Sequence, residues 1–87
     1  MITLDEAKKY LRVDFDDEDD FINHLIDTAE SLVKDTARVD ELTDDTAERI
    51  AVLYAIGYLF EHREDADLHN LTLMLRSILF GVREVKF

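Results

Sequence analysis

Apolar residues recur along the chain mainly at three- and four-residue spacing, and acidic stretches separate them. Residues with this period lie on one face of an α-helix. The sequence has no proline and only two glycines, Gly57 and Gly81, so little interrupts a helix. We therefore predict an all-α fold, a compact bundle of about four helices in which two long central antiparallel helices are flanked by two shorter ones.

The first predicted helix covers Leu4–Leu11. Thr3 and Glu6 match a capping box, in which each side chain accepts a hydrogen bond from a backbone N–H that the first turn leaves unpaired. The second helix follows the acidic run at 16–20 and ends near residue 38, and one Asp of the run is expected to cap it. Its apolar residues form a single stripe, so this long helix is amphipathic.

The third predicted helix spans about 44–62, with Thr43 as its N-cap, and contains the most apolar segment of the chain. Every position in 50–60 except Gly57 is apolar. A helix that is apolar all round must be covered all round. The cover is either the rest of its own chain, which would make this the central core helix, or partly a neighbouring subunit.

One side of this segment has the features of an interface. Gly57 costs about 1 kcal/mol relative to alanine inside a helix, so we expect another group to pack against its backbone. Tyr54 and Tyr58 are four residues apart, and their hydroxyl groups need a partner or water, as at a boundary. We predict that Tyr54, Gly57 and Tyr58 belong to an assembly interface.

The fourth predicted helix covers Leu68–Phe80, with Gly81 just after its C-cap. We predict a single helical domain over residues 1–81 and a C-terminal tail over residues 82–87. The tail either is disordered or folds back on the bundle, or it inserts into a partner. In the last case Val82, Val85 and Phe87 form a second assembly interface.

The composition favours association and excludes several classes of protein. The chain has 87 residues, no cysteine and three isolated histidines, so it lacks disulfide and zinc staples, and a core of this size supplies only roughly 3 to 5 kcal/mol. Its acidic start is unlike a signal peptide. The apolar run at 50–60 has about half of the roughly 20 residues that span a bilayer. We therefore predict no membrane span, and we predict no cofactor or metal site. We also predict no catalytic site, because neither Ser31 nor Ser77 lies in a glycine-containing turn that could expose it as a nucleophile.

The chain carries 21 acidic and 10 basic residues, a net charge of −11, which argues against nucleic-acid binding. Counted from Asp14, the acidic run lacks the glycine and the final glutamate of a calcium-binding EF-hand loop. The acidity either keeps the protein soluble or forms a repulsive lining for something negative.

Three segments follow one another in a distinctive order. They are the opening TLDEAKKYLRVD at 3–14 with the acidic run after it, the apolar helix that runs into YLFEHRE at 58–64, and the closing segment at 75–83. In this order they resemble the small head-tail connector proteins of tailed bacteriophages and prophages. The resemblance covers nearly the whole chain and rests on order and spacing, since none of the motifs is catalytic.

The resemblance implies a non-enzymatic structural protein of the virion, made in the host cytoplasm and located at the capsid vertex or neck. It implies a homo-oligomeric ring of about twelve copies. The ring joins the portal protein to a downstream head-completion or tail protein, serves DNA packaging and continues the DNA channel. Within this picture, we hypothesise that acids at 16–20 or at 40–45 face the channel. The first group consists of Asp16, Asp17, Glu18, Asp19 and Asp20.

Two other classes share some of these features. A small acidic regulatory protein, such as an antitoxin or DNA mimic, would occupy a basic protein partner and exist as a stable monomer or dimer. A helix-turn-helix regulator needs a basic recognition helix, and the last two predicted helices offer only Arg49, Arg63 and Arg76. The connector is therefore the favoured hypothesis.

Overall fold

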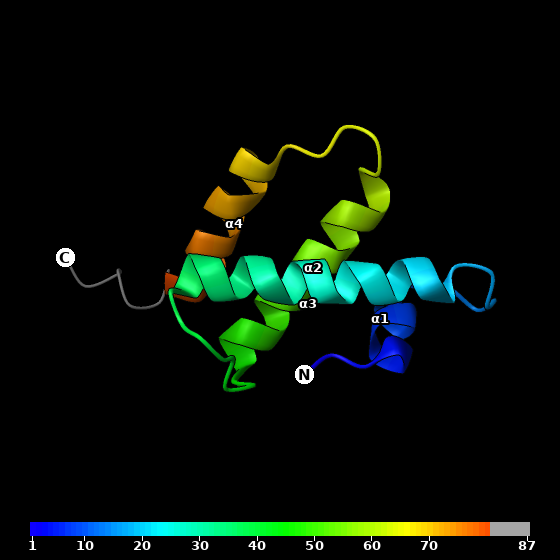
Figure 1. Ribbon diagram of the computed structural model, residues 1–87, viewed down its shortest axis with the longest axis horizontal. Helices are drawn as coiled ribbons and strands as arrows, with labels where there is room; N and C mark the ends of the chain where they lie inside the picture. Colours follow the sequence, from blue (N-terminus) through cyan, green and yellow to red (C-terminus); the bar gives the residue numbers. More distant parts are fainter. Residues whose placement is uncertain (81–87) are drawn as a thin grey trace.

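The computed structural model describes residues 1–80, which form four helices joined by loops (Figure 1). The helices are α1 (Leu4–Leu11), α2 (Asp19–Ala37), α3 (Thr46–Glu61) and α4 (Leu68–Phe80). No strand occurs in this part of the chain, so the predicted all-α bundle is confirmed. The predictions for Gly81 and for Val82, Val85 and Phe87 of the tail lie outside the described residues.

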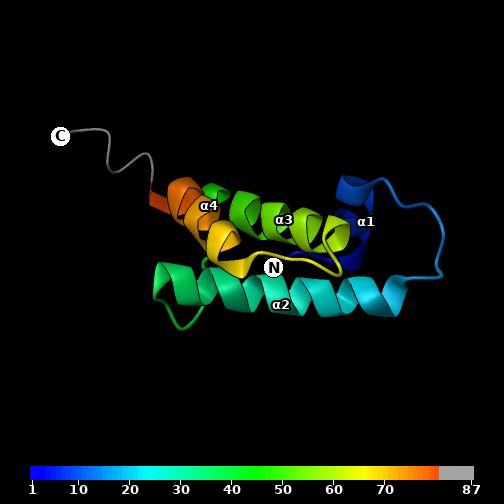
Figure 2. The same cartoon turned by 90° about the horizontal axis from the view of Figure 1, so that it is seen from above.

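The four helices form two layers. Figure 2 shows α2 alone in one layer and α1, α3 and α4 in the other. α3 crosses α2 obliquely and runs back in the opposite sense, and α1 and α4 lie on opposite flanks of α3 (Figure 1). Each flanking helix contacts both α2 and α3, whereas α1 and α4 do not contact each other. The long helices therefore form the centre, and each short helix closes one side.

The core lies between the two layers and takes side chains from all four helices. Small residues on α3, Ala51 and Ala55, are fully buried beside Val52 and Ile56, which allows α3 to approach its neighbours closely. The fully buried apolar residues are Ala7, Ile22, Ala29, Val33, Ala51, Val52, Ala55, Ile56, Leu71 and Leu75. Inward positions on α2 and α4 follow the helical period that the sequence predicted.

α1 begins and ends as a capped helix. The capping box is present, with the Thr3 hydroxyl accepting from the Glu6 N–H at 3.1 Å and the Glu6 carboxylate accepting from the Thr3 N–H at 3.2 Å. The helix stops at Arg12, whose φ of 61° lies in the left-handed region. α2 stops in the same way at Arg38, with φ 61°. Both ends use a conformation that glycine prefers, in segments that contain no glycine.

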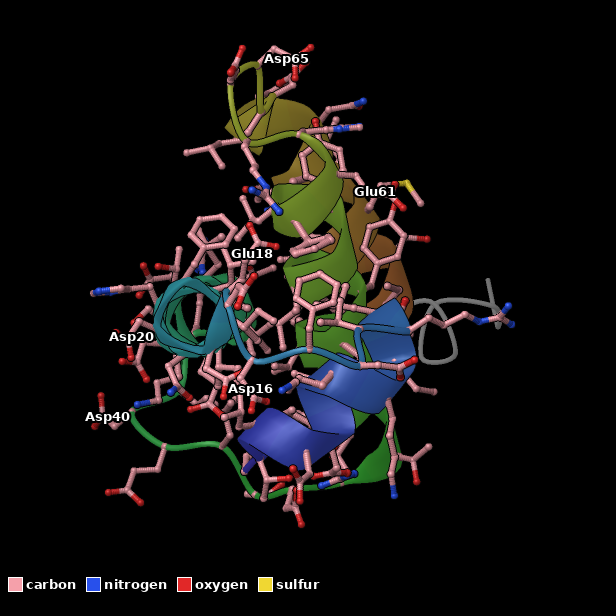
Figure 3. All side chains as sticks on the ribbon, turned by 90° about the vertical axis from the view of Figure 1, so that its right-hand side faces the viewer. Asp16, Glu18, Asp20, Asp40, Glu61 and Asp65 are labelled. Carbon is pink, nitrogen blue, oxygen red and sulfur yellow. The ribbon has the colours of Figure 1, made fainter. Side chains whose placement is uncertain are left out.

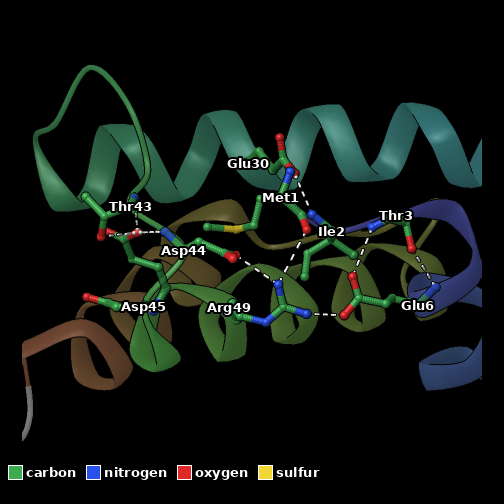
Figure 4. Close-up of polar contacts among 10 residues, drawn as sticks. Met1, Ile2, Thr3, Glu6, Glu30, Thr43, Asp44, Asp45 and Arg49 are labelled. Carbon is green, nitrogen blue, oxygen red and sulfur yellow. Dashed lines mark hydrogen bonds and ion pairs between the residues drawn. The ribbon is translucent and has the colours of Figure 1, made fainter.

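The start of α3 differs from the prediction. The N-cap is Asp45, whose carboxylate accepts from the Glu48 N–H at 2.8 Å, and the expected cap at Thr43 is wrong. Glu48 is only 8% exposed, and its carboxylate accepts from the N–H groups of Thr43 and Asp44 (Figure 4). Because Glu48 holds residues 43 and 44 outside the helix, Asp44 adopts φ 66° and the helix begins at Thr46.

The start of α2 also differs. Its N-cap is Glu18, which makes no side-chain capping hydrogen bond, so the expected Asp cap is wrong. Asp19 and Asp20 lie in the first turn, where carboxylates complement the positive end of the helix dipole. The physical reason is that these acids have other partners. Asp16 and Asp19 bind Lys8 of α1, and Glu18 binds Arg63, so their carboxylates do not cap the N–H groups of α2.

Within residues 1–80, the chain fully covers only one side of the apolar segment at 50–60. Ala51, Val52, Ala55 and Ile56 are fully buried, whereas Ile50 is 50% exposed. Residues Tyr54, Gly57 and Tyr58 are half-buried. α3 is thus the core helix of its own domain along one face, and it reaches the surface along the other.

Candidate assembly surfaces

A groove of about 620 Å³ lies between the end of α1 and the second half of α3. Its lining joins aromatic and apolar side chains with a few charged groups: Tyr10, Leu11, Arg12, Tyr54, Gly57, Tyr58, Phe60, Glu61 and His62. All three predicted interface residues of α3 line this one groove. The structure therefore brings Tyr54, Gly57 and Tyr58 together on the partly uncovered side of the helix.

The group that packs against Gly57 comes from the same chain. A Cβ atom at position 57 would lie 3.0 Å from Cε2 of Tyr10, which is tighter than ordinary van der Waals contact. Tyr10 is itself 48% exposed, so its ring forms one wall of the groove and is not locked in the core. The sequence predicted a contact at Gly57 but did not indicate that Tyr10 of α1 makes it.

Tyr58 ties the end of α3 to the beginning of α4. Its hydroxyl oxygen accepts from the Asp67 N–H at 2.9 Å, and the Asp67 carboxylate accepts from the Asn70 N–H at 3.0 Å, which caps α4. The Tyr58 ring stacks on His62 with centroids 4.2 Å apart. Tyr54, by contrast, has no hydrogen bond to its hydroxyl within residues 1–80. Tyr58 is thus partly structural, and Tyr54 presents a hydroxyl to the groove.

Two acids of the run at 16–20 bind one lysine of α1. Lys8 Nζ lies 2.8 Å from Asp16 Oδ1 and 2.8 Å from Asp19 Oδ1. Hydrogen bonds to Asp16 and Asp19 raise the pKa of Lys8 above its usual value. The hydrogen bond from Lys8 likewise holds the pKa of Asp16 below its usual value. These contacts attach the acidic run to α1.

A third acid of the run, Glu18, binds Arg63 beyond the end of α3. Two parallel hydrogen bonds of 2.8 and 3.0 Å join the guanidinium and the carboxylate. The guanidinium carbon also lies 4.6 Å from the ring centroids of Phe21 and of Phe60, so Arg63 packs over both aromatic rings. Glu18 and Arg63 therefore clamp the start of α2 to the end of α3.

The remaining two acids of the run, Asp17 and Asp20, are exposed and make no ion pair within the described residues. Figure 3 looks along α2 and shows Asp20 and Asp40 on the side of α2 that faces away from α3. The run is thus divided between three acids that bind cations of this chain and two that face solvent. Whether any of them lines a channel stays a prediction.

The second acidic stretch, at 40–45, lies in the loop before α3, and Arg49 of α3 connects this loop to α1. Its guanidinium forms an ion pair with Asp44 at 2.8 Å, another with Glu6, and donates to the Met1 carbonyl at 3.4 Å (Figure 4). Together with the Asp45 cap, these contacts occupy two acids of the stretch. Asp40 and Glu41 remain exposed.

The sequence from residue 1 to residue 83 matches the family model described as phage gp6-like head-tail connector protein. The match covers nearly the whole chain. The chain belongs to this family. Neither curated proteins nor solved structures yield a match. The resemblance that the sequence predicted is therefore confirmed, and the protein is a structural connector of the phage head-tail junction at the virion neck.

The family is one of structural connectors and not of enzymes. Within residues 1–80 of this connector, no three His, Cys, Asp or Glu side chains are grouped so that they could hold a metal ion. No helix of the same region is long and apolar enough to cross a membrane.

A further surface of the connector was not predicted from the sequence. α4 directs Leu71 and Leu75 into the core, while Leu73 is 46% and Met74 43% exposed on its outward side. Leu68, at the beginning of the helix, is exposed as well. The helical period would have revealed this outward side, because the spacing of Leu73 from Leu71 and Leu75 places it on the opposite face.

Proposed function

We propose that this connector forms a closed ring of about twelve copies beneath the portal. The ring joins the portal protein to a downstream head-completion or tail protein and continues the channel through which DNA passes. Membership of the connector family supports the role at the head-tail junction. The ring, its partners and its channel are the parts that the proposal adds.

The observation that carries the ring is the incomplete cover of α3. Within residues 1–80, the segment at 50–60 is apolar at every position but Gly57, yet Tyr54 and Gly57 on the groove side are only half-buried. A groove with aromatic walls and polar groups at its rim has the composition of surfaces that take side chains of another protein. A domain of this size also gains stability from such contacts, because its own core is small.

We further propose that residues 1–81 act as the domain that builds the ring and that the tail at 82–87 inserts into a partner through Val82, Val85 and Phe87. The sequence of the tail supports this, since it combines three apolar residues with three charged ones. Removal of residues 82–87 tests it. We expect an unchanged helical circular-dichroism spectrum and weaker binding to the portal protein, and equal binding would contradict it.

The exposed acids acquire a role in this proposal. Asp20 and Asp40 lie on the solvent side of α2 (Figure 3), and their sequence neighbours Asp17 and Glu41 are exposed as well. A negative channel wall repels the DNA backbone and keeps it from adhering. We propose that this side of α2 faces the channel, whereas Asp16, Glu18 and Asp19 hold the fold together.

The ring is tested by measuring the mass of the purified connector, alone and with its portal protein, by mass photometry and negative-stain electron microscopy. We expect closed rings on the portal. A connector that remains monomeric with the portal protein present contradicts the proposal.

The channel wall is tested on assembled rings. The pair Asp17→Asn and Asp20→Asn should increase the retention of double-stranded DNA at low salt. The pair Asp5→Asn and Asp14→Asn removes the same charge from other exposed positions and serves as the control. Equal retention by both pairs would show that the α2 side does not face DNA.

A further inference from the structure

α4 differs from the rest of the connector in charge. Its only charged residue at neutral pH is Arg76, although the whole chain carries −11. Arg76 is exposed and forms no ion pair within residues 1–80. Leu73 and Met74 lie beside it on the outward side of the helix. We call Leu73, Met74 and Arg76 the α4 face.

The charge of the α4 face indicates which partner it fits. A strongly basic partner would be drawn to the acidic side of α2 and not to a helix without acids. A second copy of this acidic chain has the opposite requirement, because two acidic molecules avoid repulsion where acids of one do not face acids of the other. The α4 face has no acid, which favours a second copy as its occupant.

The groove is the complementary surface. Tyr10, Tyr54 and Phe60 supply aromatic walls for apolar side chains, and Glu61 is exposed at the rim. Arg63, the basic residue nearest in sequence, is bound to Glu18. Glu61 is therefore available to an incoming cation at the end of the groove, while Arg12 stands on the α1 side.

The two surfaces are placed for a head-to-tail contact. The groove lies where α1 meets α3, and α4 lies on the opposite flank of α3 without contacting α1 (Figure 1). Two different patches on opposite sides of one molecule join copies in a row, and rotation at each step closes the row into a ring. A twofold dimer would need a single self-complementary patch instead.

We propose that the α4 face of one copy enters the α1–α3 groove of the next copy. Leu73 and Met74 contact the walls made by Tyr10 and Tyr54, and Arg76 pairs with Glu61 of the neighbour. This inference deepens the proposed function and rests on it, since it specifies the contact that builds the ring.

Cross-linking tests the contact directly, because the chain contains no cysteine that could give a background. The double variant Leu73→Cys with Tyr54→Cys is assembled on the portal protein and mildly oxidised. We expect a ladder of disulfide-linked oligomers on a non-reducing gel. A mixture of the two single variants should give covalent dimers and no longer products, because each copy then has one reactive side.

Two variants that each add one negative charge provide the second measurement. Leu73→Asp should weaken ring assembly by roughly tenfold or more, as removal of a central interface residue does. Thr28→Asp adds the same charge at an exposed position of α2 and should leave assembly within about twofold. Circular dichroism and urea unfolding confirm that both variants keep the fold.

The outcomes separate this inference from the proposed function. If Leu73→Asp forms normal rings and the double cysteine variant gives no ladder, the α4 contact is overturned but the ring remains. Intact rings of Leu73→Asp that no longer bind the portal protein assign the α4 face to the portal and also overturn the inference. A wild-type chain that forms no ring with its portal overturns both.

Discussion

α1 and α4 pack on the same two helices from opposite flanks of α3, yet their outward sides differ. On α1, Asp5 and Lys9 face solvent, and Lys8 binds the acidic run. On α4, Leu73 and Met74 face outward without any acid on the helix. Both helices are capped at their beginning, by Thr3 and by Asp67. The two flanking helices therefore begin alike, with a capped first turn, but their outward sides differ. The outward side of α1 is charged, and that of α4 is largely apolar.

Substitutions on the two sides of α4 should change the free energy of unfolding by very different amounts. Leu75→Ala should lower the free energy of unfolding by about 3 kcal/mol, because it leaves a cavity at a fully buried position. Leu73→Ala should change it by less than about 0.5 kcal/mol in the monomer. Urea unfolding at low protein concentration measures both. Similar losses for the two variants would show that Leu73 is part of the monomer's own core.

The caps should show how alike the two helices are. Thr3→Ala and Asp67→Ala each remove a side-chain acceptor for an N–H of the first turn, and each should cost about 1 kcal/mol. Thermal unfolding followed by circular dichroism provides the comparison. A loss confined to one variant would mean that only one flanking helix depends on its cap.

Acid should weaken the contact between α1 and the acidic run. Because Lys8 lowers the pKa of Asp16 below its usual 3.8 in the folded state, the stabilisation is present above that pH and is lost as the pH falls through the folded pKa. The effect should be small, since the Asp16 side chain is 87% exposed. Urea unfolding between pH 2 and pH 6 measures it.

Asp16→Asn is the matched variant for the acid experiment. It should lose less stability than wild type below about pH 4, since one of the groups that titrate there is gone. The contact between α1 and the acidic run would be refuted by parallel pH profiles of the two proteins.

The contact between Gly57 of α3 and the Tyr10 ring of α1 should change stability least. Gly57→Ala gains up to about 1 kcal/mol of helix propensity but must displace the Tyr10 ring, which the new Cβ would approach to 3.0 Å. Because Tyr10 is half-exposed and free to turn, we expect a net gain of a few tenths of a kcal/mol. Repeating the substitution in a Tyr10→Ala background should recover the full gain. A net loss in both backgrounds would point to a different neighbour.

Local sequence patterns were enough to predict the helices, the capping box at Thr3, the bounds of α1 and α4, and a contact at Gly57. These follow from local rules, since helical period and cap chemistry depend on residues three or four positions apart. The family was also recognisable from the order of its motifs. Tyr54, Gly57 and Tyr58, which the sequence singled out, are half-buried, and their place in an assembly interface stays a prediction.

The partner that each side chain takes depends on how the helices pack. Glu18 binds Arg63, 45 positions away, and Arg49 binds Glu6, 43 positions away. Glu48 accepts N–H groups of Thr43 and Asp44 in a buried site, and the N-cap of α3 is therefore Asp45 and not Thr43. Such choices depend on which helices meet in space. A local pattern can therefore name the residues that need partners, but the packing of α1, α2 and α3 selects the partners.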